Sequence, residues 1–158
     1  MRHLVFHSSY DLTVDDKNRI LVPSEVRKKF DAERDGEALF LVTGRDARLW
    51  LYPALYYEQL VSQEAGELTP TEDTVAFYRM MLGLAHRVEW DKQGRVLLPD
   101  KALRRHGLGK EVSLVGALDH LELWNRSDWL AEEEALNARR HDVFEKIRLA
   151  RMNASQQP

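Results

Sequence analysis

The 158-residue chain contains no cysteine, which excludes disulfide bonds, thiolate zinc sites and a cysteine nucleophile. It also lacks any run of the roughly 20 apolar residues that a membrane-spanning helix needs. The first residues, MRHLVFHSSYD, show no long apolar run after a basic start, so no signal peptide is expected. With 44% hydrophobic and 31% charged residues, the chain is predicted to be a soluble, cytoplasmic, globular protein without a membrane partner.

Patterns that would indicate an enzyme or a metal protein are missing too. The six histidines form no close helical pair and no His-Glu-x-x-His spacing, so neither a metal site nor a cofactor is expected. The sequence shows no nucleophile–base set, no phosphate-binding loop and no paired acid site. The chain is therefore not expected to be an enzyme.

Charge is distributed unevenly along the chain. The net charge of −3 would by itself argue against a nucleic-acid partner. However, residues 1–30 and 91–110 carry net charges of +2 and +4, whereas residues 31–90 and 111–158 carry −6 and −3. Positive charge in two short segments creates the local field that docking on phosphate requires.

The two basic segments contain an internal repeat. The first reads DDKNRILVP over 15–23, and the second reads DKQGRVLLP over 91–99, at an offset of 76 positions. Further on, LY at 51–52 parallels LW at 123–124 at an offset of 72, which places a four-residue longer loop around residues 31–37. The repeat predicts a duplicated module. We expect a first module at 1–66, a linker helix at 67–86, a second module with a C-terminal helix at 87–152, and a flexible tail at 153–158.

Each copy is predicted to form a strand, a tight turn, a strand, a short helix, two strands and a longer helix. Asn18 and Gly94 share one turn position, and both residue types tolerate a positive φ. The aliphatic triplets at 20–22 and 96–98 are expected to be buried strands that end at proline. The other expected strands are 6–14, 39–42, 51–52, 111–116 and 120–124, and the expected helices are 24–30, 53–65, one after Thr69-Pro70, 100–106, and one from Asn125 or Ser127 to about residue 152.

The last helix carries an apolar stripe at Trp129, Leu136, Val143 and Ile147. These positions follow helical spacing, so we expect the stripe to pack on its own domain and only secondarily to mark a subunit contact.

The doubled pattern Asp-x-x-(Gly/Asn)-Arg, followed by three hydrophobic residues and Pro, resembles the MraZ family of bacterial regulators. GLGKEVSLVG at 107–116, LELW at 121–124 and MLGLA at 81–85 are similar to that family as well. The resemblance implies an α+β fold in which duplicated AbrB-like modules form a split, swapped-hairpin β-barrel with flanking helices. It also implies a homo-oligomeric ring at the nucleoid that binds double-stranded DNA at promoter direct repeats of the division and cell-wall gene cluster.

The resemblance places the DNA-reading positions in the two turns. They are Lys17 and Arg19 in the first copy and Arg95 in the second, where Gln93 occupies the slot of Lys17 and Lys92 is shifted by one position. The residues expected to support the turns are Asp15, Asn18, Asp91 and Gly94. An arginine on a hairpin can bond to guanine in the major groove. Because Lys17 lies beside Arg19, we expect the first copy to contribute more to DNA binding than the second.

Several alternatives stay open from the residues alone. Each Asp–Arg pair could be only a structural ion pair that stabilises its hairpin. The basic residues of the short helices either contact phosphate or are simply solvated; they are Arg27, Lys28, Lys29, Lys101, Arg104 and Arg105. The alternatives to a transcriptional regulator are an AbrB-type architectural or antitoxin protein, and a ring-forming scaffold without DNA binding.

Overall fold

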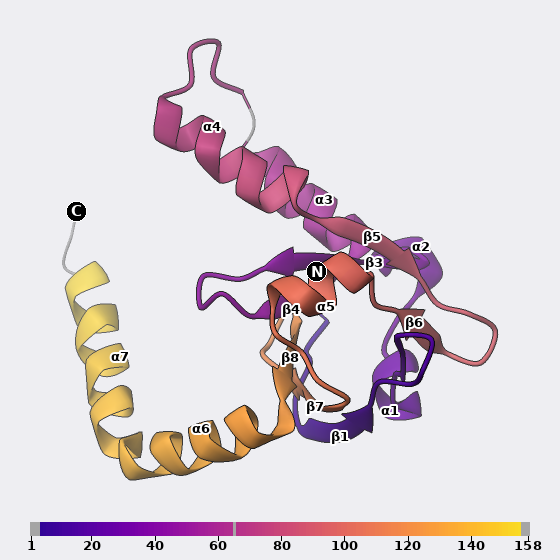
Figure 1. Cartoon of the computed structure of the whole chain (residues 1–158). Helices are drawn as coiled ribbons and strands as arrows, with labels where there is room; N and C mark the ends of the chain where they lie inside the picture. The colour runs from indigo at the N-terminus through magenta and orange to yellow at the C-terminus, as the bar shows by residue number, and fades with distance from the viewer. Residues whose placement is uncertain (1–3, 65, 156–158) are drawn as a thin grey trace. The chain divides into compact units, whose positions relative to one another are not determined.

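A computed structural model describes residues 4–64 and 66–155 of the chain (Figure 1). The chain divides into two compact units, Met1–Asn125 and Arg126–Pro158, and each is described by itself below. Every helix in the described ranges is too short or too polar to cross a lipid bilayer.

The first unit contains both copies of the repeat. Its strands are β1 (Ser9–Thr13), β2 (Arg19–Leu21), β3 (Ala38–Thr43), β4 (Leu49–Pro53), β5 (His86–Glu89), β6 (Arg95–Leu97), β7 (Glu111–Gly116) and β8 (Leu121–Asn125). Its helices are α1 (Ser24–Arg27), α2 (Ala32–Asp35), α3 (Ala54–Gln63), α4 (Glu72–Tyr78), the π-helical turn η1 (Arg79–Gly83) and α5 (Asp100–Arg105).

Strands from the two copies are interleaved within the sheets. The larger sheet has the order β1-β7-β8-β4-β3-β5, and β2 and β6 form a separate two-stranded ribbon. The first strand of each copy therefore pairs with a strand of the other copy: β1 pairs with β7, and β5 pairs with β3. All strand pairs are antiparallel. The expected α+β class is confirmed. The six-stranded sheet is open in the described residues, because β1 and β5 are its two edges.

The core lies between the ribbon and the larger sheet. Ile20 of β2 and Val96 of β6 are paired at the centre of the ribbon, and both are fully buried. They pack with the inward side chains of β3, β4, β7 and β8, which include Leu41, Leu51 and Leu114. Burial of each such side chain contributes about 1.5–3 kcal/mol, so the ribbon is attached to the sheet by its central residues.

The ribbon also corrects one prediction. The triplets at 20–22 and 96–98 were expected to be buried throughout, but Leu21 and Leu97 are 53% and 55% exposed. The reason is that successive side chains of a strand point to opposite faces. Because Ile20 and Val96 point into the core, their neighbours in β2 and β6 point outward.

Helices α1 and α5 follow Pro23 and Pro99, as expected, and bury Val26, Ala102 and Leu103. The helix expected over 24–30 is shorter, because α1 ends at Arg27. The loop expected around 31–37 contains the extra helix α2. Its first turn is capped by Asp31, whose carboxylate accepts hydrogen bonds from the amides of Glu33 and Arg34.

Two further strand and helix boundaries differ from the prediction. The strand expected over 6–14 starts only at Ser9, because Ser8 has a φ of 70° and Phe6 forms an isolated bridge with Leu118. The helix expected over 53–65 is α3, Ala54–Gln63, and residue 65 lies outside the described residues.

The second unit consists of two helices where one was predicted. Helix α6 is Arg126–Ala138 and helix α7 is Arg140–Ala154, and the break falls at Arg139, whose φ and ψ are −104° and 16°. The side chain of Asn125, the last residue of the first unit, bonds to Gly107 O and Gly109 N. Of the expected tail, residues 153 and 154 belong to α7, and residues 156–158 lie outside the described residues.

The apolar stripe of this unit is described for the unit by itself. Leu136, Val143 and Ile147 are 36%, 37% and 49% exposed. No residue of α6 or α7 is buried in the described chain. That the stripe packs on its own domain therefore stays a prediction.

Candidate nucleic-acid interface

The first turn is organised by the carboxylate of Asp15. One carboxylate oxygen accepts hydrogen bonds from the backbone amides of Lys17 and Arg19, both at 2.9 Å. The other oxygen accepts one from Nε of the Arg19 side chain at 2.8 Å. The Asn18 amide donates to Asp15 O at 3.0 Å, and Asn18 itself adopts a φ of 60°. One carboxylate thus fixes both the backbone of the turn and the direction of the arginine.

The second turn repeats this arrangement. Asp91 accepts hydrogen bonds from the amides of Gln93 and Arg95, both at 2.9 Å, and from Nε of Arg95 at 2.6 Å. The Gly94 amide donates to Asp91 O at 3.0 Å, and Gly94 has a φ of 79°. All four residues that are expected to support the turns, Asp15, Asn18, Asp91 and Gly94, take part in these bonds.

Both aspartates are held in the ionised form. The hydrogen bond from the Arg19 amide has the largest effect on the pKa of Asp15 and, with the Arg19 side chain and the Lys17 amide, lowers it below its usual 3.8, although partial burial opposes the shift. The amide of Arg95 has the same leading effect on the pKa of Asp91. At neutral pH each arginine therefore faces a full negative charge.

The ion pair leaves part of each guanidinium available. Only Nε of Arg19 and of Arg95 bonds to the aspartate. Within residues 4–64 and 66–155, the terminal Nη atoms of these arginines form no hydrogen bond. The arginine is thus oriented by its inner nitrogen and can still donate from its outer end, which is the geometry that bidentate recognition of an acceptor pair needs.

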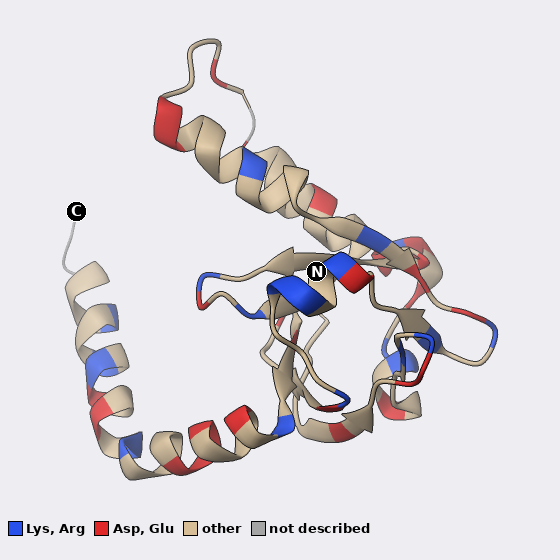
Figure 2. Cartoon of the chain, in the orientation of Figure 1, with Lys and Arg blue, Asp and Glu red and all other residues tan. Residues whose placement is uncertain are grey.

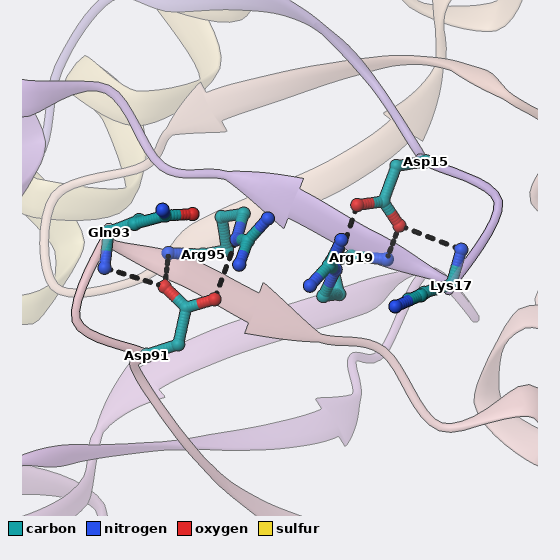
Figure 3. Close-up of polar contacts among 6 residues, drawn as sticks. All are labelled: Asp15, Lys17, Arg19, Asp91, Gln93 and Arg95. Atoms are coloured by element: carbon teal, nitrogen blue, oxygen red, sulfur yellow. Dashed lines mark hydrogen bonds and ion pairs between the residues drawn. The ribbon is translucent and has the colours of Figure 1, made fainter.

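The two arginines lie on one face of one ribbon. In β2 and β6, Arg19 is opposite Leu97, Ile20 is opposite Val96, and Leu21 is opposite Arg95. Directly opposed residues share a face, and Ile20 and Val96 occupy the inner one. Arg19 and Arg95 therefore share the outer face, with their Asp–Arg pairs at opposite ends of the ribbon (Figure 3).

The lysines of the turns are placed differently from the arginines. Lys17 and Lys92 are both exposed. In the part of the chain that the structure describes, neither ammonium group forms an ion pair. Asp16, next to Lys17, pairs with Lys110 at 2.9 Å. The first turn therefore contains a second acidic residue, Asp16, whose negative charge Lys110 compensates. The second turn has no acidic residue besides Asp91 (Figure 2).

One of the basic helix residues lies beside the turn of the other copy, a position that the sequence did not predict. Arg27, at the end of α1, packs against Gly94 of the other copy, and its Nε donates to Val22 O at 2.9 Å. Its place beside a turn almost 70 positions away depends on the pairing of β2 with β6. By contrast Arg104 of α5 is 75% exposed in its side chain and pairs with Asp100 in its own helix.

No group of three or more His, Asp or Glu side chains suited to a metal ion occurs among residues 4–64 and 66–155. The chemistry available at the ribbon is therefore that of oriented cations, aliphatic side chains and backbone amides. Such a surface suits an anionic ligand with hydrogen-bond acceptors.

The sequence matches, over residues 5–78 and 81–147, the family described as "MraZ protein, putative antitoxin-like". A Shewanella oneidensis protein named "Transcriptional regulator MraZ" is 35% identical over 129 residues, which cover 81% of this chain and 84% of that protein. A Shewanella baltica protein of the same name is 34% identical over 149 residues, which cover 92% and 97% of the two chains. Each of the two matched segments contains one of the Asp–Arg turns, and the chain belongs to the MraZ family.

Proposed function

We propose that the chain is a sequence-specific, DNA-binding transcriptional regulator rather than an enzyme, and that Arg19 and Arg95 read base edges. The observation that carries this proposal is the position of both arginines on the outer face of one ribbon, each oriented by an aspartate through Nε. A two-stranded ribbon fits the major groove, and arginine bonds there to O6 and N7 of guanine. The names of the relatives in Shewanella support the same role.

The partial exposure of the two Asp–Arg pairs favours a role of the arginines in DNA recognition over a purely structural role. An exposed Asp–Arg pair contributes only about 0–1 kcal/mol to stability, and each side chain of the two pairs is 24–37% exposed. Holding the arginine in one direction before binding reduces the entropy lost when it meets its acceptor. In this proposal Lys17 and Lys92 contact phosphates beside the two reading positions.

The proposal includes the assembly implied by the family. The interleaved strands would form the AbrB-like, swapped-hairpin barrel, with the modules 1–66 and 87–152 joined by the linker 67–86. Several chains would assemble into a ring in the cytoplasm, at the nucleoid, and bind direct repeats in the promoter of the division and cell-wall gene cluster. Binding of several subunits to repeats about 10 base pairs apart would raise the affinity by a factor of about 10²–10⁴.

The test is a footprint on the chain's own upstream region, followed by mobility shifts with Arg19→Ala and Arg95→Ala. Each substitution is expected to cost about 1–3 kcal/mol per engaged site and to relax the base preference at one position. Arg87→Ala is the matched control, because Arg87 is also exposed and paired with a carboxylate, that of Glu89, but lies on β5. A folded Arg19→Ala protein that shifts the fragment normally would overturn the site. Absence of any shift by the wild type would favour the scaffold.

A further inference from the structure

The outer face of the ribbon carries two leucines as well as two arginines. Leu21 and Leu97 are 53% and 55% exposed, and each lies directly opposite an arginine, Leu21 opposite Arg95 and Leu97 opposite Arg19. The face is thus a group of four side chains in which the apolar pair and the cationic pair occupy the two diagonals. Burial of the exposed part of a leucine side chain on binding is favourable, so this face can gain free energy from an apolar contact.

The arginines decide what kind of partner can cover these leucines. A protein surface that buried Leu21 and Leu97 would also bury the outer ends of Arg19 and Arg95, which form no hydrogen bond to the described residues. Burying unpaired charges carries a large desolvation penalty. The major groove of DNA offers both complements side by side: paired acceptors on guanine and, as its apolar group, the C5-methyl of thymine.

Resting on the proposed function, we propose that Leu21 and Leu97 contact thymine methyl groups and so add a second specificity element beside the arginines. The scale of the ribbon fits this arrangement. Arg19 and Arg95 are two residues apart along the strands and one strand apart across the ribbon, which is about 8 Å for strand spacings of about 3.4 and 5 Å. That distance corresponds to two to three base steps of about 3.4 Å.

The symmetry of the ribbon adds an expectation about the DNA sequence. An approximate twofold axis through the Ile20–Val96 pair exchanges Arg19 with Arg95 and Leu21 with Leu97. Placed in the groove, the ribbon brings equivalent side chains to the two DNA strands. We therefore expect two guanines on opposite strands and, related by the same axis, two thymines on opposite strands.

The experiment isolates the methyl group. A duplex is first selected from a random pool by the wild-type protein, and each thymine in its footprint is then replaced singly by deoxyuridine, which removes only the C5-methyl. Loss of one buried carbon of about 0.8 kcal/mol corresponds to about a fourfold loss of affinity. We expect this loss at one or two thymines that the ribbon contacts and none at the thymines outside the ribbon's contact.

Leu21→Ala and Leu97→Ala complete a double-mutant cycle. Each variant is expected to bind the thymine duplex more weakly and to lose its sensitivity to deoxyuridine at one of the contacted positions. Both residues are more than half exposed, so the thermal unfolding midpoint should stay close to that of the wild type. Arg19→Ala is the second control: it should weaken binding while keeping the deoxyuridine effect.

The outcomes separate the two proposals. If no duplex is selected and no fragment shifts, the proposed function itself fails. If the selected duplex binds and Arg19→Ala weakens it, but every deoxyuridine is harmless or the leucine variants keep the full deoxyuridine effect, the contact with thymine is overturned alone. A change of molar mass on light scattering for Leu21→Ala, with an unchanged deoxyuridine response, would assign the leucines to a subunit contact instead and would also overturn it.

Discussion

The side chain of Arg27 fills the space into which a Cβ on Gly94 would project. Such a Cβ would lie 2.5 Å from Cδ, Nε and Cζ of Arg27, which belongs to the other copy of the repeat. In the second copy, the position that matches Arg27 is Leu103 of α5, which lines the same surface pocket as Asn18. The turn residue with a side chain thus shares a pocket with a leucine, whereas the glycine lies beside an arginine.

This relationship predicts that the two turns respond differently to exchange of their residues. Gly94→Asn forces Arg27 to move and lose its bond to Val22, so the free energy of unfolding should fall by about 1–3 kcal/mol. Asn18→Gly removes a side chain from a position with a φ of 60° and should change it by less than about 1 kcal/mol. Urea denaturation measures both. Arg27→Ala should restore part of the loss caused by Gly94→Asn, and equal losses in the two turns would contradict this explanation.

Arg27 should also matter for DNA binding. Because it lies against the second turn, we expect it to contact a phosphate, so that Arg27→Gln weakens binding evenly across sequences. The slope of log K against log salt should decrease by about 0.9 per engaged site. Arg104→Gln is the matched control, since Arg104 occupies a short helix of the other copy but pairs with Asp100.

A salt slope that Arg27→Gln leaves unchanged would mean that Arg27 only packs on Gly94. A different pair of variants, Arg19→Ala and Arg95→Ala, addresses how strongly each of the two turns contributes to DNA binding. Lys17 should increase the contribution of the first turn to DNA binding. Arg27, and the lack of a second acidic residue in the turn, should increase the contribution of the second turn. Comparison of Arg19→Ala with Arg95→Ala on one duplex measures which effect is larger.

His120 is expected to make the stability of the first unit depend on pH. Its ring is 8% exposed and lies between Asp119, at 2.7 Å from Nδ1, and Glu122, at 3.4 Å from Nε2. Burial lowers the pKa of His120, but the hydrogen bonds and charges of Glu122 and Asp119 outweigh it and raise the pKa above 6.5. The stabilisation is therefore complete below pH 6.5 and is lost as the pH rises through the folded-state pKa.

The measurement is the free energy of unfolding at several pH values between 6 and 9, together with an NMR titration of the His120 ring. We expect the free energy to decrease with rising pH in the wild type and to vary less in His120→Gln. An NMR pKa at or below 6.5 would show that burial dominates and would contradict the prediction.

The exposed apolar residues of α7 predict a role in assembly. Phe144 and Ile147 are 67% and 49% exposed, and exposed apolar patches of this kind commonly mark protein–protein contacts. Phe144→Glu combined with Ile147→Glu should shift the assembly towards the 18.4 kDa chain on light scattering. Lys146→Glu, on the same helix, should leave the molar mass unchanged. A wild type that is already monomeric at all concentrations would exclude the homo-oligomer.

The sequence alone was sufficient for features that depend on neighbouring residues. The Asp-x-x-x-Arg turns were predictable because the hydrogen bonds that each aspartate carboxylate accepts join residues at most four positions apart. The repeat also predicted that Asn18 and Gly94 share a left-handed conformation. The short helices after Pro23 and Pro99 were predictable from their local pattern, although not to the residue.

Only the tertiary structure decided which side chains of the two copies meet. The pairing of β2 with β6 joins residues about 76 positions apart, and nothing local in either segment specifies that register. That pairing brings Arg19 and Arg95 to one face and exposes Leu21 and Leu97, which the run of aliphatic residues had suggested were buried. It also places Arg27 on Gly94. A strand that is buried on one face needs apolar residues only at alternate positions. In a run of three aliphatic residues, composition therefore could not show which leucines face outward. The packing of Ile20 and Val96 in the core shows that Leu21 and Leu97 do.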